Sequence, residues 1–462
     1  MITTLFIALR NVLRNRRRTL VTLITLAIGE IALLIFGGYS NAVVHGVETG
    51  VIRQAGHLQV QRKNYFLLGA GSPVDYSIAD YESLVQLIRN DPDIGPHLRV
   101  ITPLLQVQGI AGNFSDNMTR TVNGYGYIPR DQNVMRHWNE YGFPDNPRNV
   151  PLPEDDKDSM SLGVGVARAL NLCSKLKVPN CQDIPRKQKQ GGATAPSDIV
   201  DLAESTQTPS DRRPGVRLDF LAASASGAPN VINARVVAAE SLGVKEIDDS
   251  YLAMPLEMAQ ALVYGRDSKP QATSIILQLD SMKDLEPVRK RLQTLISERN
   301  LDLEVLDYAT LFPAYGQIKG LFYSIFGFVS TLIGVVVLFS VANTMGTSVI
   351  ERTVEIGTIR SMGVRWLGIA RQFLAEGFLI GAIGTLSGCV IALLLALAIN
   401  SAGLTWTPPN SIDKIPLVVH VFNSPLMVIS SVLVLLMLSI LSSVVPAWRA
   451  ARIPVVEALR HV

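Results

Sequence analysis

Four stretches of this chain are apolar for long enough to cross a lipid bilayer, which takes about 20 helical residues. Only two residues within them are charged, Glu30 and Glu376. Because a helix satisfies its own backbone hydrogen bonds in lipid, the stretches predict a bundle of four transmembrane helices. The predicted spans are residues 19–44, 321–345, 373–399 and 426–445.

The arginines and lysines outside the spans predict the orientation of the chain, because short cytoplasmic segments carry most of the positive charge. Residues 1–18 contain five arginines, residues 346–372 four and residues 446–462 three. The short segment 400–425 contains only Lys414. We therefore expect both chain ends and the 346–372 loop in the cytoplasm, and the 400–425 loop outside. In a two-membrane bacterium, the protein is then a multi-pass protein of the inner (cytoplasmic) membrane.

Residues 45–320 are mostly polar and predict a large folded α+β domain in the periplasm, inserted between the first and second spans. Within it, residues 173–214 contain too few apolar side chains to build a core, so we expect a mobile insertion. Strand-like and helix-like patterns are spread through the rest of the domain. The expected strands are 57–61, 99–110, 120–128, 230–240, 272–280 and 301–307, and the expected helices are 80–91, 255–265 and 282–299.

Two cysteines of this outer domain, Cys173 and Cys181, have seven residues between them. An oxidising compartment favours a disulfide that closes this small loop, and two unpaired thiols are the alternative. Two cysteines without nearby histidines are too few ligands for a zinc site, so we expect no metal.

Composition and motifs argue against an enzyme. Hydrophobic residues make up 48% of the chain, and its net charge of +3 carries no basic stripe of the kind that binds nucleic acid. The chain has no phosphate-binding G-x-x-x-x-G-K-[ST] loop, no catalytic motif and only six dispersed histidines. We therefore expect no catalytic residue and no cofactor in this chain, and any ATP and magnesium must be bound by a partner.

The intramembrane polar residues are the remaining candidates for chemistry within the bilayer. Glu30 lies in the middle of the first span, where a charge is costly, so it must be protonated, face a wet cavity or bond to a polar neighbour such as Asn343. Glu376 lies near the cytoplasmic start of the third span, within reach of interfacial water. We leave open whether Glu30 has a function or is a neutral hydrogen-bonding group.

Residues 1–18 have a stripe of leucine and valine opposite a stripe of arginine, as in an amphipathic elbow helix that lies on the membrane surface. The alternative is a positively charged start that only sets the topology.

Two cytoplasmic sequences identify a family. ERTVEIGTIRSMGVRWLGIARQFLAEGFLIGAIG and the ending PAWRAARIPVVEALRHV resemble the signatures of the FtsX/MacB-like ABC transporter permeases. The start ALRNVLRNRRRTLVTLITLAIG and AGHLQVQRKNYF resemble the lipoprotein-releasing (LolC/LolE-type) branch, whereas the 173–214 insertion and Glu30 depart from the pattern. The resemblance implies a permease that pairs with a second permease, as a homodimer or heterodimer, and with two separate ABC ATPase subunits.

The resemblance makes the 346–372 loop a coupling helix that docks in a groove of the ATPase. Charged residues would form the docking face, with Met362 and Ile359 as apolar anchors. Gly357 would allow close approach, and Gly363 suits a helix end. The predicted coupling residues are Glu351, Arg352, Glu355, Ile356, Gly357, Ile359, Arg360, Met362 and Gly363 in the loop, with Arg449, Arg452 and Glu457 in the tail.

Two functions are compatible with these features. The first is ATP-driven extraction or export of a lipoprotein, lipid or other amphipathic cargo, because the spans carry no paired charges to conduct ions and the outer domain is large. The second is a signalling permease that transports nothing and conveys motion to a periplasmic partner, as in FtsX. A periplasmic adaptor or lipoprotein and membrane lipids are further expected partners.

Overall fold

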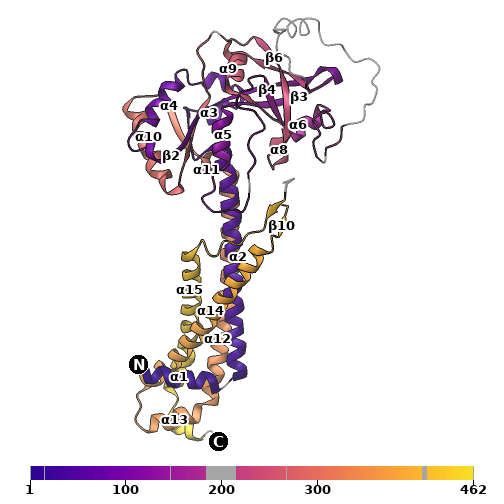
Figure 1. Ribbon diagram of the computed structural model, residues 1–462. Helices are drawn as coiled ribbons and strands as arrows, with labels where there is room; N and C mark the ends of the chain where they lie inside the picture. Colours follow the sequence, from indigo (N-terminus) through magenta and orange to yellow (C-terminus); the bar gives the residue numbers. More distant parts are fainter. Residues whose placement is uncertain are drawn as a thin grey trace. The chain divides into compact units, whose positions relative to one another are not determined.

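The computed structural model describes residues 2–14, 16–145, 147–179, 181–183, 215–266, 268–407 and 414–460 (Figure 1). The chain forms two compact units. The membrane unit comprises Met1–Gly46, Tyr315–Leu404 and Pro416–Val462, and the α+β unit comprises Val47–Ala314 and Thr405–Ile415. Most of the predicted insertion, residues 184–214, lies outside the described residues.

Within the described part of the chain, four helices are long and apolar enough to cross a bilayer. Each contains one of the predicted spans and continues beyond it, because the flanking polar residues extend the same helix. The prediction of a membrane protein with four spanning helices and an α+β unit is confirmed at this level. The four helices, which run side by side in Figure 1, are α2 (Arg16–Ala55), α12 (Pro313–Glu351), α14 (Trp366–Ser401) and α15 (Pro425–Arg452).

Glycines along α14 let this helix lie close to two neighbours. A Cβ added at Gly377 would lie 2.7 Å from the Cβ of Ser443 on α15. A Cβ added at Gly388 would lie 2.7 Å from the carbonyl oxygen of Ala27 on α2. Small residues at such spacings allow close packing of transmembrane helices. The glycines with these short approaches are Gly377 and Gly381 toward α15, and Gly384 and Gly388 toward α2.

The ends of the long helices are joined by short elements. The helix α1 (Ile2–Arg14) precedes α2, α13 (Thr353–Ser361) lies between α12 and α14, and α16 (Val455–Arg460) follows α15. A small hairpin of β10 (Thr405–Trp406) and β11 (Ile415–Pro416) lies between α14 and α15 in the sequence.

The first part of the α+β unit is a four-stranded antiparallel sheet with the order β2-β8-β1-β9. Its chain order is β1 (Leu58–Arg62), α4 (Tyr81–Arg89), β2 (Leu98–Asn113), β8 (Ser274–Leu279), α10 (Leu285–Glu298) and β9 (Leu303–Asp307). This is the βαββαβ arrangement of a ferredoxin-like fold. Apolar side chains of both helices share one core with the strands.

The second part of the α+β unit is a closed circuit of six strands, inserted between β2 and β8. The strand β2 is 16 residues long, so its first half pairs with β8 and its second half pairs with β3 and β5. The circuit continues through β3 (Met118–Tyr127), β7 (Tyr251–Pro255), β4 (Ser159–Gly163), β6 (Pro229–Glu240) and β5 (Arg217–Ala223) before it returns to β2.

A core that includes Phe220 fills the circuit. The other α-helices among the described residues of the unit are short: α3 (Tyr65–Leu68), α5 (Pro129–Arg136), α6 (Val164–Ala169), α8 (Lys245–Asp248), α9 (Leu256–Tyr264) and α11 (Tyr308–Leu311).

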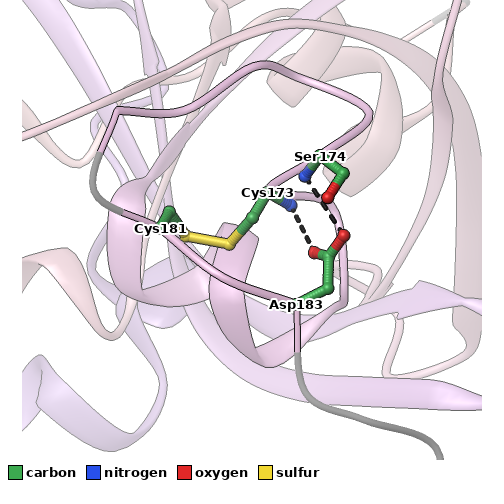
Figure 2. Close-up of a disulfide and its surroundings, with 4 residues drawn as sticks. All are labelled: Cys173, Ser174, Cys181 and Asp183. Atoms are coloured by element: carbon green, nitrogen blue, oxygen red, sulfur yellow. Dashed lines mark hydrogen bonds between the residues drawn. A yellow bond between two sulfur atoms is a disulfide. The ribbon is translucent and has the colours of Figure 1, made fainter.

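A disulfide joins Cys173 and Cys181 just after α6 (Figure 2). The carboxylate of Asp183 closes the same loop, because it accepts hydrogen bonds from the backbone N–H groups of Cys173, at 2.9 Å, and Ser174, at 3.2 Å. A hydrogen bond from the Ser174 side chain, together with these two backbone hydrogen bonds, holds the pKa of Asp183 below its usual range. The disulfide and the hydrogen bonds to Asp183 therefore each fix this end of the insertion.

We expect both thiols to be protected from alkylation in protein isolated without reductant. On the chain-entropy view, a loop of this length stabilises the folded state by about 2.5 kcal/mol. Replacing both cysteines with serine should therefore lower the melting temperature, and Asp183→Asn should lower it further in that variant. Intact-mass analysis after alkylation checks the bond; labelling of both thiols in oxidised protein would contradict it.

Candidate functional site

The segment between α12 and α14 is a short helix with a defined start and end. The backbone turns at Arg352, which separates α12 from α13. At the other end Gly363 has φ 94°, a left-handed conformation that favours glycine. The N–H of Gly363 donates to the carbonyl of Arg360 at 3.0 Å, and that of Val364 donates to the carbonyl of Ile359 at 3.4 Å. These two bonds form a Schellman end, so α13 stops before Trp366 starts α14.

A buried ion pair joins the start of α13 to α14. The Nη1 atom of Arg352 lies 2.8 and 3.0 Å from the two carboxylate oxygens of Glu376, and the Asn11 side chain of α1 donates to the same carboxylate at 2.7 Å. The Arg352 guanidinium also lies 5.4 Å from the centre of the Phe373 ring. Arg352 is 8% exposed and Glu376 is 3% exposed. Three separate segments therefore meet at one charged contact.

This contact corrects two predictions. Glu376 is not an exposed carboxylate near the start of α14, because it is buried and bound to Arg352. Arg352 does not belong to an exposed docking face, because its guanidinium is directed into the chain's own bundle. A cavity of about 20 Å³ lies beside the pair and is lined in part by Asn11, Arg18 and Glu376. That volume suits about one water molecule.

The inner side of α13 packs against the ends of the bundle. Ile356 is buried with Ile369, Phe373 and Ala447, and Ile359 is half-buried against the same core. A Cβ added at Gly357 would lie 2.7 Å from the Cβ of Ala458 on α16. The Arg360 guanidinium donates a short hydrogen bond to the carbonyl of Ile453.

Four of the predicted coupling residues contact the chain's own C-terminal segment and core: Ile356, Gly357, Ile359 and Arg360. Ile356 and Gly357 are buried, so they do not lie on an exposed docking face, whereas Ile359 and Arg360 are half-buried and their coupling role stays a prediction.

The outer carboxylates of the segment bind arginines of the N-terminal region. Arg14 of α1 lies 2.9 Å from Glu355, and Arg18 lies 2.8 Å from Glu351. The hydrogen bond from Arg14 holds the pKa of Glu355 below its usual range. Because both pairs are roughly half exposed, they orient the segments more than they stabilise them.

A second set of the predicted coupling residues is exposed. Met362 is 73% exposed, and Val364, Trp366 and Leu367 beside it are also exposed apolar residues. In the C-terminal segment the guanidinium of Arg452 stacks on the Trp448 ring at 4.1 Å. We call this set the outer surface; its residues are Met362, Val364, Trp366, Leu367, Trp448, Arg449, Arg452 and Glu457.

Glu30 is fully buried within the membrane unit. One of its carboxylate oxygens accepts a hydrogen bond from Ser431 of α15 at 2.7 Å, and the other has no hydrogen-bond partner in the described part of the chain. The predicted neighbour Asn343 is exposed, so the interaction with Glu30 that we considered is not formed. The close approach of Gly388 to α2 brings α14 against this glutamate.

Sequence reasoning missed several partners of the site. Asn11, Arg14, Arg18 and Ala458 each complete a contact of α13 or its neighbours, and Ser431 completes the contact of Glu30. The sequence shows arginines alternating with apolar residues around residue 11. This pattern does not predict that the Asn11 side chain is directed toward Glu376. Among the described residues, no group of three or more His, Cys, Asp or Glu residues is placed to hold a metal ion.

The fold and the site define a class of protein: a membrane protein with four helices that can span a bilayer, in which the short helix α13 packs on the chain's own helical bundle. Residues 327–455 match the family model of the FtsX-like permease C-terminal domain, so this part of the chain is an FtsX-like permease domain. The resemblance to the FtsX/MacB-like permeases, with a LolC/LolE branch, is confirmed.

Three curated proteins illustrate the similarity. The lipoprotein-releasing system transmembrane protein LolC of Xylella fastidiosa is 30% identical over 146 residues, which are 30% of this chain and 35% of LolC. LolE of Haemophilus influenzae is 27% identical over 46% of this chain and 52% of its own length. The macrolide export ATP-binding/permease protein MacB of Marinobacter nauticus is 28% identical over 34% of this chain and 24% of its own length. The chain thus spans between about a quarter and a half of these relatives.

Proposed function

We propose that this chain is the permease subunit of an ATP-driven ABC transporter that extracts or exports a lipoprotein, lipid or other amphipathic cargo from the inner membrane. A separate ATPase subunit binds ATP and magnesium, and this chain turns hydrolysis into motion of the α+β unit in the periplasm. Two ATPase copies and a second permease complete the assembly, and an adaptor or lipoprotein is its periplasmic partner.

One observation carries the proposal: α13 is fastened on its inner side, and exposed apolar residues follow its C-terminal end directly. The buried Arg352–Glu376 pair and the Gly357 contact fix α13 to α14 and to the C-terminal segment. The outer surface beside it combines exposed apolar residues with arginines, a composition enriched at protein interfaces. A force applied to the outer surface would therefore reach α14 and α15 directly.

The helix α2 supports transmission to the α+β unit. It is continuous from Arg16 to Ala55, although the boundary between the two units lies after Gly46. Beyond this boundary Glu48 accepts hydrogen bonds from Tyr141, at 2.6 Å, and from Tyr308. A displaced α2 would thus pull on two separate segments of the α+β unit.

The cargo class rests on two points. The four spanning helices carry no lysine or arginine in their apolar windows, so they offer no charged path for small ions. Relatives named for lipoprotein release and for macrolide export each match about a third of this chain. An amphipathic cargo taken from the leaflet surface suits both points.

The test uses the chain purified from its own membrane in mild detergent, with the ATPase that accompanies it. Met362→Asp and Arg449→Glu place a charge, or reverse one, on the outer surface without a contact to the chain's own core. Each should reduce retention of the ATPase at least tenfold, because disrupting a buried interface contact costs about 2–5 kcal/mol. The matched control is Lys414→Glu, an exposed residue of the 400–425 segment.

The same complex tests the cargo. Acylated protein or phospholipid should stimulate ATP hydrolysis more than a soluble peptide does, and Met362→Asp should abolish the stimulation. Equal retention of the ATPase by both outer-surface variants and by the control would refute the coupling role. Stimulation by a soluble periplasmic protein alone would favour the signalling alternative.

A further inference from the structure

The arginines around the α1–α2 junction fall into two sets. Arg14 and Arg18 bind Glu355 and Glu351 at the edges of α13. The second set is exposed and forms no ion pair with any described residue. It consists of Arg10, Arg16 and Arg17.

The two sides of α1 differ in what they contact. Ala8 and Val12 are buried, and Val12 packs in the core of the helical bundle. Phe6 and Leu13, which lie seven residues apart and so share a face, are 70% and 58% exposed. Arg10 lies close to that exposed apolar face in the helical rotation of 100° per residue. A helix with an exposed apolar strip edged by arginines suits the boundary between lipid headgroups and acyl chains.

We propose that Arg10, Arg16 and Arg17 bind the phosphate groups of anionic phospholipids, and that this contact holds α13 in place. The apolar strip of α1 enters the same leaflet, which positions the three guanidinium groups at headgroup depth. Arginine is well suited to this ligand because its planar fork forms paired hydrogen bonds with phosphate oxygens.

The path from lipid to α13 consists of three contacts of the same segment. Arg14 binds Glu355, Arg18 binds Glu351, and Asn11 binds the carboxylate that holds Arg352. Arg10 directly precedes Asn11, and Arg16 and Arg17 directly precede Arg18. A lipid bound to the second set therefore restrains the neighbouring residues that contact α13 and its ion pair. The amount of negative charge in the cytoplasmic leaflet therefore determines how firmly α13 is held in place. Its consequence for ATP hydrolysis rests on the proposed function.

The test uses the full chain alone in nanodiscs, so it does not depend on an ATPase. Hydrogen exchange of the α13 amides is measured in phosphatidylcholine and in mixtures with phosphatidylglycerol. We expect slower exchange in α13 as phosphatidylglycerol increases, and a loss of this effect at high salt, which screens the charges. Each arginine near an anionic surface raises the affinity of its segment for the membrane roughly fivefold. The three arginines together should therefore raise the affinity of the α1–α2 junction for a phosphatidylglycerol-rich membrane about a hundredfold.

Two variants and a control separate the proposal from simpler effects. The triple variant Arg10→Gln, Arg16→Gln, Arg17→Gln should lose the response to phosphatidylglycerol, and the triple lysine variant should largely keep it. The control is Arg99→Gln, Arg130→Gln, Arg266→Gln, which removes the same charge from exposed sites of the α+β unit. Cysteine accessibility of the chain ends verifies that each variant keeps its topology.

The lipid titration of the wild-type chain tests the proposal even if the glutamine variant inserts incorrectly into the membrane. Exchange in α13 that is the same in both lipids overturns the proposal, and so does a glutamine variant that inserts normally and responds like the wild type. A lipid response in a chain that retains no ATPase would support the lipid contact while contradicting the proposed function, so the two failures are distinguishable.

Discussion

Glu376→Gln is expected to destabilise the membrane unit by about 3–5 kcal/mol, the usual cost of removing one partner from a buried ion pair. The amide cannot neutralise Arg352, whose guanidinium would stay buried against Phe373 without its counter-charge. Arg352→Met should cost less, because the remaining carboxylate keeps its hydrogen bond from Asn11 and lines a cavity that suits about one water molecule. The free energy of unfolding in bicelles is the measurement.

The double variant Arg352→Met, Glu376→Met distinguishes a charge effect from a packing effect. Replacing a buried pair by apolar side chains of similar size is often neutral, so the double variant should recover most of the stability lost in Glu376→Gln. The exposed pair of Arg18 with Glu351 provides the control: Glu351→Gln should change the stability by about 1 kcal/mol or less. If Glu376→Gln were as mild as Glu351→Gln, the Arg352–Glu376 pair would be solvated in the membrane and would not fix the start of α13 to α14.

The buried pair also shows where sequence reasoning reached its limit. The 346–372 loop was predicted to be a coupling helix from its resemblance to the permease family, with its charged residues as the docking face, but neither the resemblance nor the charges tell which side of the helix faces inward. Arg352 lies on the same face as Ile356, four residues on, and that apolar neighbour was the available signal. The partner Asn11 is 365 residues from Glu376 in sequence, so no local pattern links the two.

The membrane helices were predictable because length and apolarity alone define them. The strands of the α+β unit were only partly predictable from the sequence. Six strands were expected near their observed positions, but β4, β5 and β7 were missed. All five residues of β4 are buried, so it has no alternation of polar and apolar positions. The closure of the six-strand circuit depends on pairings between distant segments, which a single sequence does not reveal.

Gly388→Leu and Gly377→Leu are expected to disrupt the helical bundle. At Gly388 even a Cβ would lie 2.7 Å from a backbone oxygen of Ala27 and 2.8 Å from the Cβ of Glu30, so α14 must move away from α2. Backbone atoms cannot yield as a flexible side chain can. Overpacking of this kind typically costs about 3 kcal/mol, and the displaced helix would also strain the Glu30–Ser431 hydrogen bond.

Gly327→Leu is the matched control, because a Cβ at this position of α12 meets no atom within 4 Å. Leucine is a better helix former than glycine by roughly 1 kcal/mol, so this variant should be neutral or slightly stabilised. All three variants add the same side chain to a spanning helix. They differ mainly in how much space surrounds the substituted glycine. The half-life of the folded chain in detergent at elevated temperature should therefore fall sharply for Gly388→Leu and Gly377→Leu alone. Equal half-lives in all three would mean that α14 does not approach its neighbours through its glycines, and the force path from α13 through α14 to α2 would lose its physical basis.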